Sequence, residues 1–172
     1  MNGFLLLIPL IVIRFGLLRM LSKTALKRAA FFAPVEGIEK IAYFFYQIAN
    51  ILIFIYPFFL KISIVPYWFY IGLVIYVLGV FLCIAAVFNF AKPAENGILL
   101  KGIYRISRNP MYVAYFVYFL GCVLLTQSWI LLAVLIVFQV SSHWIILSEE
   151  RWCINNFGEE YKNYMKKVRR YI

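Results

Sequence analysis

The residues most suited to chemistry lie in two short stretches of an otherwise apolar chain. The first, RISRNPMYVAYF at residues 105–116, sets Arg108 and Asn109 directly before Pro110. An asparagine followed by a proline is typical of a helix start, and the free N–H groups at such a start favour an anion. We therefore predict that Arg108 and Asn109 form part of a binding site. An ordinary capped helix beside lipid headgroups would contain the same residues.

The second stretch lies in the last long apolar run and ends in two adjacent acids, Glu149 and Glu150. Gln139, His143 and Glu150 are spaced so that a helix would bring them within about 40° of one another on one face. Because the helix dipole disfavours acids at a C-terminus, the glutamate pair indicates function. Because a histidine side chain is suited to accept a proton in catalysis, His143 is the first candidate for a general base, with Glu150 the second. Gln139 and His143 could instead only hydrogen-bond to neighbouring helices.

These groups together would suit a ligand with several kinds of polar group. Carboxylates bind an ammonium group or a ribose diol, a helix start binds a carboxylate, and aromatic side chains stack on adenine. The segment 89–110 adds further hydrogen-bonding side chains, and Gly97 and Gly102 permit close backbone approach. S-Adenosylmethionine presents all of these groups. ATP or a lipid headgroup would use similar parts, so the residues alone do not select the ligand.

The composition places these residues in a membrane protein. The 172-residue chain is 65% apolar, with a mean hydropathy of +0.88, which leaves too little polar surface for a soluble globule. The net charge of +10 is typical of a membrane protein with basic cytoplasmic loops, and no basic helix with interleaved aromatics indicates a nucleic-acid partner. One histidine and three dispersed cysteines predict no metal site.

The chain must position these residues with apolar helices. A helix needs roughly 20 apolar residues to cross a bilayer, and five runs qualify or nearly do, the fourth being short. They cover residues 3–21, 41–60, 66–88, 111–126 and 129–147. The sequence thus predicts an all-α integral membrane bundle of one domain, 1–172. Three spans fill residues 1–88, and a cofactor-binding loop, a helical hairpin and an amphipathic C-terminal helix fill residues 89–172.

The basic residues predict the orientation of this bundle. With five spans, the basic segments 22–40 and 89–110 and the tail from 148 all fall on one side, which the positive-inside rule makes cytoplasmic. The N-terminus would then lie outside, with the C-terminus and the active site in the cytosol. On the third apolar run, Gly72, Gly79, Cys83 and Ala86 fall near one face and predict close helix packing.

Two motifs in the second half of the chain match a known pattern. GIYRISRNPMYVAYFVYFLG (102–121) and SEERWCINNFGEEYKNYMKKVRR (148–170) flank a helical hairpin. They resemble the C-terminal half of the isoprenylcysteine carboxyl methyltransferase and phospholipid methyltransferase superfamily. The resemblance covers about residues 89 to 170 and rests on both motifs at a plausible separation. The first 88 residues match only in hydropathy.

The resemblance implies a polytopic enzyme that binds S-adenosylmethionine from the cytosol and methylates an acceptor arriving from the bilayer. Family positions imply that Glu150 completes an acidic pair with a cofactor-binding Glu149. The implied cofactor contacts are Asn89, Asn96, Gly97, Ile98, Leu99, Tyr104, Asn109, Pro110, Met111, Tyr112 and Glu149. Arg108 joins this site through the anion-binding argument given above.

Departures from the family pattern bear on the acceptor. Asn109 stands where the family more often has histidine, and the resulting N-P-M-Y also occurs in the phospholipid N-methyltransferase branch. Ile145 stands where the carboxyl methyltransferases place an arginine that serves the substrate. We therefore expect a phospholipid headgroup amine as the acceptor. A prenylated cysteine carboxylate, a small hydrophobic thiol or alcohol, a non-catalytic scaffold and a nicotinamide-dependent membrane reductase are the alternatives.

Overall fold

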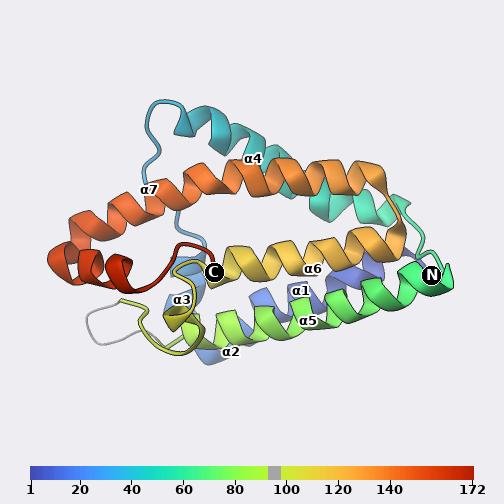
Figure 1. The fold of residues 1–172 in the computed structure, drawn as a ribbon, viewed down its shortest axis with the longest axis horizontal. Coiled ribbons are helices and arrows are strands. Elements are labelled where there is room, and N and C mark those ends of the chain that lie inside the picture. The colour runs from blue at the N-terminus through green and yellow to red at the C-terminus, as the bar shows by residue number, and fades with distance from the viewer. Residues whose placement is uncertain (93–97) are drawn as a thin grey trace.

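The computed structural model describes residues 1–92 and 98–172, apart from the side chains of Lys23 and Leu26. These residues fold as a bundle of helices (Figure 1), which confirms the expected all-α class. In chain order the elements are η1 (Gly3–Leu7), α1 (Ile8–Ile11), η2 (Val12–Leu17), α2 (Leu18–Leu21), α3 (Lys23–Ala29), α4 (Glu39–Ile55), η3 (Tyr56–Phe59), α5 (Pro66–Phe90), η4 (Gly102–Arg105), α6 (Pro110–Thr126) and α7 (Trp129–Lys167).

Four helical segments of the described chain are long and apolar enough to cross a bilayer, so the protein is a multi-pass membrane protein. They are Gly3–Leu21, Glu39–Phe59, Pro66–Phe90 and Trp129–Lys167. The expected span over 111–126 forms α6, which at 17 residues is shorter than the others. Five crossings, and the side of the membrane on which the termini lie, therefore stay predictions.

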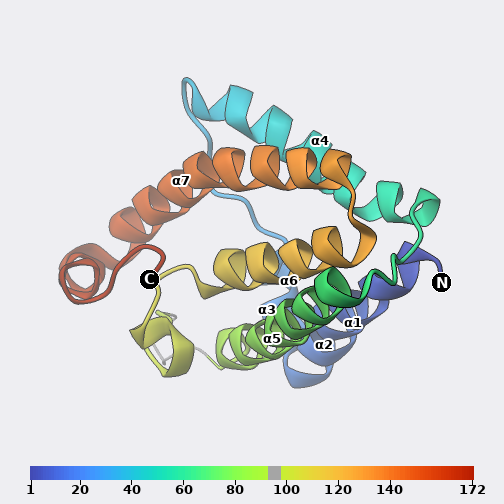
Figure 2. The ribbon, with the colours of Figure 1, turned by 45° about the vertical axis from the view of Figure 1, so that its right-hand side comes forward.

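The long helices pack as two pairs. Figures 1 and 2 show α6 beside α5 and α7 beside α4, with the N-terminal helix lying against α5. Only Gln127 and Ser128 separate α6 from α7, which confirms the tight antiparallel hairpin. Gln127 adopts a left-handed conformation (φ 49°), and the Ser128 hydroxyl accepts a hydrogen bond from the Leu131 N–H at 3.2 Å. The chain therefore reverses at once and sends α7 toward α4.

Glycines let α5 and α6 approach closely. The predicted small-residue face of α5 is buried at all four positions, Gly72, Gly79, Cys83 and Ala86, as expected for packing. A Cβ atom on Gly79 would lie 2.6 Å from the Tyr118 backbone nitrogen in α6, and Gly121 of α6 faces the Tyr76 backbone of α5 in the same way. The two helices therefore meet backbone to backbone, which fixes where α6 begins.

The predicted C-terminal helix follows directly on the last apolar run, as the continuation of α7 past a kink. Helix α7 continues to Lys167 and bends at Gly158, whose φ of 55° suits glycine. After the bend, Tyr161 and Tyr164 are buried against Ile98, and the Tyr164 hydroxyl donates to the Tyr104 carbonyl at 2.6 Å. The apolar face of the tail is therefore covered by the segment that precedes α6.

A salt bridge connects the start of α4 to α7. Two nitrogens of the Arg151 guanidinium each lie 2.7 Å from an oxygen of Glu39, the first residue of α4. The same guanidinium donates to the Pro34 carbonyl at 3.0 Å, which fixes the loop 30–38. Figure 1 shows this loop, α3 and the C-terminal tail at one end of the bundle, opposite the α6–α7 turn.

The close approach of α5 and α6 can be tested by replacing glycine with alanine at two positions, one at the helix contact and one away from it. We expect Gly79→Ala to lower the free energy of unfolding by about 1–3 kcal/mol, because the added methyl group overpacks the contact with Tyr118. Gly16→Ala is the matched control, since a Cβ there meets only the Val12 side chain at 3.8 Å. Thermal unfolding of the solubilised variants measures the difference. Equal melting temperatures would contradict the packing.

Candidate active site

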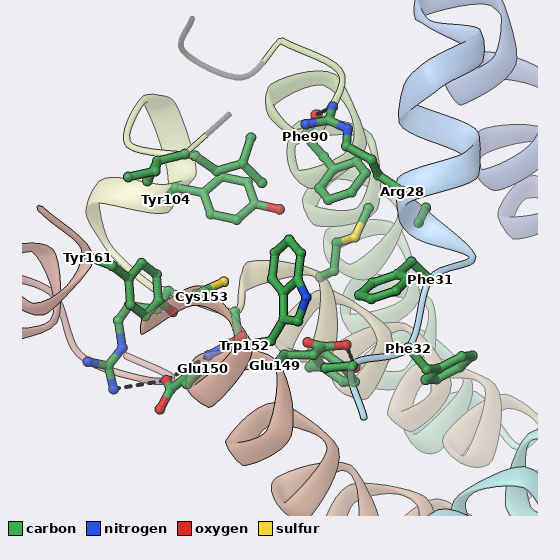
Figure 3. A pocket seen from close by; sticks show the side chains of 18 of the residues that line it. Arg28, Phe31, Phe32, Phe90, Tyr104, Glu149, Glu150, Trp152, Cys153 and Tyr161 are labelled. Carbon is green, nitrogen blue, oxygen red and sulfur yellow. Dashed lines mark hydrogen bonds and ion pairs between the residues drawn. The ribbon is translucent and has the colours of Figure 1, made fainter. Parts of the chain in front are cut away.

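A cavity of about 600 Å³ lies at the end of the bundle where α3, the loop 30–38 and the C-terminal part of α7 meet. Figure 3 shows side chains from α3, the loop after it, α5, η4 and α7 pointing into it. This volume is within the range of small-molecule sites, which is roughly 300–1,000 Å³. Nine residues predicted for the site line it: Ile98, Leu99, Tyr104, Arg108, Asn109, Met111, Tyr112, Glu149 and Glu150.

The start of α6 is fixed to the C-terminal tail. The helix begins at Pro110 with Asn109 at the N-cap position, as predicted. The Asn109 side chain does not cap the helix, however. Its amide nitrogen donates to the Arg170 carbonyl at 3.2 Å and lies 3.5 Å from a Glu150 oxygen, while the Arg108 N–H donates to the Arg169 carbonyl at 3.0 Å. The Asn109 side chain is therefore turned toward tertiary partners and makes no capping hydrogen bond with the helix.

Glu150 is held between two arginines. Arg108 lies 3.0 Å from one carboxylate oxygen, and Arg170 donates to the other at 2.8 and 3.1 Å. The side chains of Glu150 and Arg108 are 4% and 8% exposed. The hydrogen bond to Glu150 raises the pKa of Arg170. Both oxygens of Glu150 are thus occupied, which suits a structural anchor better than a general base.

Glu149 has the opposite environment from its neighbour. A rotation of about 100° along the helix turns its carboxylate to another side of α7, as Figure 3 shows for the two labelled glutamates. It lines the cavity and accepts a hydrogen bond from the Tyr112 hydroxyl at 3.0 Å. Glu149 has no ion pair within residues 1–92 and 98–172. It can therefore bind a cation that enters the cavity.

Aromatic rings line another part of the cavity. Figure 3 shows the side chains of Phe90, Tyr104 and Trp152 around it. Burial raises the pKa of Tyr104, so its hydroxyl stays neutral. The Arg28 guanidinium lies 5.1 Å from the centre of the Phe90 ring and donates to the Phe90 carbonyl at 3.0 Å. Burial lowers the pKa of Arg28, which as an arginine remains charged. These rings can stack on a flat heterocycle.

Some expected residues lie elsewhere. The Asn89 side chain donates to the Ala85 carbonyl at 2.7 Å and packs against Gly102, whose φ of +60° and lack of a Cβ atom allow that contact. Pro110 is buried at the start of α6 and does not line the cavity. Asn96 and Gly97 lie outside the described residues.

His143 is a clear departure from expectation. Its Nδ1 lies 2.8 Å from the Tyr171 hydroxyl, and it is not among the cavity-lining residues. The face shared by His143 and Glu150 is thus the one on which Tyr171 and Arg170 of the tail bind. Gln139, the third residue of the stripe, has a buried side-chain oxygen without a partner in the described chain. Sequence spacing identified the shared face correctly. Glu150 lines the cavity, whereas Gln139 and His143 are not among its lining residues. Spacing does not reveal which segment covers a face.

The N-terminal wall of the cavity was missed. Arg14, Lys27, Arg28, Phe31 and Phe32 all line it. Arg14 did leave a signal, because a charged residue inside an apolar span marks function by default. The other four lie in an unremarkable basic and aromatic segment, where nothing in the spacing indicates a site.

Fold and site together define an integral membrane protein with a charged and aromatic cavity at one end of its helices. The family model for phospholipid methyltransferases matches residues 65–160, more than half of the chain, and the protein belongs to that family of membrane methyltransferases. No curated protein and no solved structure gave a match. The matched region includes α5, α6 and both glutamates, whereas the N-terminal wall and the arginine at position 170 lie outside it.

The arginine pair around Glu150 leads to a stability prediction. We expect Glu150→Gln to lower the free energy of unfolding by about 3–5 kcal/mol, because it leaves the nearly buried Arg108 without its counter-charge. Glu149→Gln makes the same chemical change one residue away, where no arginine depends on it, and should melt close to wild type. Thermal unfolding in one detergent compares the two. An unchanged melting temperature for Glu150→Gln would refute the anchoring role.

Proposed function

We propose that the protein is an S-adenosylmethionine-dependent methyltransferase whose acceptor is a phospholipid headgroup amine in the bilayer. The observation that carries this proposal is the cavity carboxylate of Glu149, bonded to Tyr112 and unpaired within the described chain, beside a cluster of aromatic rings. Both residues belong to the region that matches the phospholipid methyltransferase model.

The residues present fit this cofactor. Glu149 and the Tyr112 hydroxyl can hold its ammonium group or ribose diol, and Phe90, Tyr104 and Trp152 offer faces for its adenine. Arg108 keeps a buried Nε without a partner among the described residues, so it retains one donor for an anionic group. When bound, S-adenosylmethionine supplies an electrophilic methyl group on a sulfonium, which an acceptor takes by in-line displacement.

The chain's own contribution is mainly positioning. Both helix pairs contribute lining residues to the cavity, and the ion pairs of Glu150 and Glu39 connect elements that line it. The apolar lining excludes water, and Glu149 draws cations toward one wall. His143, bonded to Tyr171, would need the tail to move before it could take a proton from an acceptor. We therefore assign it no step.

The phospholipid amine is preferred over a prenylcysteine carboxylate because of the position of Ile145. This residue is buried in the hydrophobic core and brings no cation to the site. The family model that matches is also the one described for phospholipids. A carboxylate acceptor would therefore lack the counter-charge expected at that position.

Cofactor binding can be measured without knowing the acceptor. We expect Glu149→Gln to weaken the binding of S-adenosylhomocysteine about tenfold or more, because a charge-assisted hydrogen bond is worth about 1.5–3 kcal/mol. Isothermal titration of the purified protein gives the affinity. Glu159→Gln is the control, since Glu159 is a surface acid whose ion pair in the described chain is with Lys162. If Glu149→Gln bound as tightly as wild type, Glu149 would not hold the cofactor.

The acceptor can be identified with methyl-labelled cofactor. In nanodiscs that contain phosphatidylethanolamine, we expect label to appear in a lipid heavier by one methyl group, as measured by mass spectrometry. Nanodiscs that contain only phosphatidylglycerol, which has no amine, should stay unlabelled. Label on an added prenylated cysteine and none on the lipid would establish the carboxyl methyltransferase instead.

A further inference from the structure

Arg14 is a charged residue inside the first apolar span, and its side chain reaches the cavity. It lies in η2, a π-helical turn within the largely apolar helix Gly3–Leu21. Its guanidinium donates to the Tyr115 hydroxyl and, at 3.1 Å, to the Ala29 carbonyl. It forms no ion pair in the part of the chain that the structure describes. A charge at such a place is costly unless it has an opposite charge to bind.

Glu149 lines the same cavity and interacts electrostatically with Arg14, but the two form no ion pair in the described chain. The surroundings of Arg14 favour a second negative charge that belongs to a ligand. Lys27 and Arg28 line the same wall of the cavity, and neither pairs with a carboxylate of residues 1–92 or 98–172. Arg108, in contrast, is already paired with Glu150. The N-terminal wall therefore carries a local excess of positive charge. An anion in the cavity would be drawn toward it.

Arg14 and Glu149 are connected through one turn of α6. Tyr115 contacts Arg14 and Tyr112 contacts Glu149, and these tyrosines are three residues apart on the same helix. Residues with this spacing are neighbours on a helix surface, with Cβ atoms about 5–6 Å apart. The cavity thus presents a cation and a carboxylate a short distance apart. This order of charges complements a zwitterionic headgroup, in which a short linker joins a phosphate to an ammonium group.

We infer that Arg14 binds the phosphate of the phospholipid acceptor and so holds the headgroup amine in the cavity beside the bound cofactor. This inference rests on the proposed function and adds to it a residue that determines acceptor specificity. Arg14 lies outside the region matched by the family model, which begins at residue 65. Phosphate recognition is therefore a contribution of this chain's own N-terminal segment. Arginine suits the task because its planar fork of donors matches phosphate oxygens.

The test compares two lipids that differ only by the phosphate. Phosphatidic acid and diacylglycerol, both without an amine, compete with phosphatidylethanolamine in the methyl-transfer assay. We expect phosphatidic acid to inhibit wild type at least tenfold more strongly than diacylglycerol, and Arg14→Gln to remove that difference while raising the KM for phosphatidylethanolamine about tenfold. Arg14→Lys keeps the charge and should give an inhibitor preference and a KM between those of wild type and Arg14→Gln. It replaces Arg14→Gln in the test if that variant is inactive.

Two controls separate phosphate recognition from other roles of Arg14. Arg19→Gln removes a charge from an exposed position of the same helix that does not line the cavity, and should behave as wild type. The affinity for S-adenosylhomocysteine should be unchanged in Arg14→Gln and Arg14→Lys. A fall in that affinity would overturn the inference, because the bound anion would then be the cofactor's carboxylate.

Other outcomes also decide the question. If Arg14→Lys retained the full preference for phosphatidic acid and the wild-type KM, or if Arg14→Gln weakened both inhibitors equally, Arg14 would only brace α3 against α6. If wild type methylated no lipid amine, the proposed function itself would fail. If wild type methylated the lipid and the Arg14 variants kept its preference for phosphatidic acid, only the inference about Arg14 would fail.

Discussion

The nearly buried carboxylate of Glu150, bound by Arg108 and Arg170, is the interaction on which the rest of the site depends. It joins the loop before α6, the long helix α7 and the C-terminal tail, which are far apart in the sequence. A carboxylate removed from water needs both partners, since the loss of either leaves a charge without compensation. The chain places this ion pair where α6 begins. The first turn of α6, with Asn109 and Tyr112, is held in position as a result.

The adjacent glutamates divide two tasks between them. Because neighbouring residues of a helix point in different directions, Glu150 reaches Arg108 and Arg170 while Glu149 reaches Tyr112, although both line the cavity. One carboxylate is neutralised by arginines and gives rigidity. The other keeps a single tyrosine partner and remains available to a cation. The same division applies to the arginines, since Arg108 is paired with Glu150 and Arg14 is not paired within the described chain. The cavity therefore presents both a cation and a carboxylate that are not ion-paired within the described chain.

Local pattern predicted much of this structure. Apolar runs located the helices, the short gap between the runs 111–126 and 129–147 located the hairpin turn, and small residues on α5 identified its packing face. The convergence of Arg108, Asn109 and the two glutamates was also predicted, in part through the family resemblance. These features depend on spacing within one helix or on a short motif, which the sequence states directly.

What sequence reasoning missed depends on contacts between distant segments. The stripe of His143 and Glu150 was real, but its partner is the tail, through Tyr171 and Arg170. The bend at Gly158 brings the tail back so that its apolar face packs against Ile98. Because this contact joins distant segments, local sequence pattern did not predict the bend. Asn109 gave up the capping role for tertiary partners, and Arg14 gained its place in the cavity from the packing of the first helix. Periodicity identifies a face, whereas the rest of the fold decides what covers it.

The central claim is that the cavity between the start of α6 and the end of α7 holds the methyl donor. A structure of the protein in nanodiscs, determined by electron microscopy or crystallography with S-adenosylhomocysteine present, tests it most directly. The account predicts ligand density in contact with Glu149 and Tyr112, with the adenine against the rings of Phe90, Tyr104 or Trp152. Density at another place on the molecule, with this cavity filled by side chains or lipid tails alone, would contradict it.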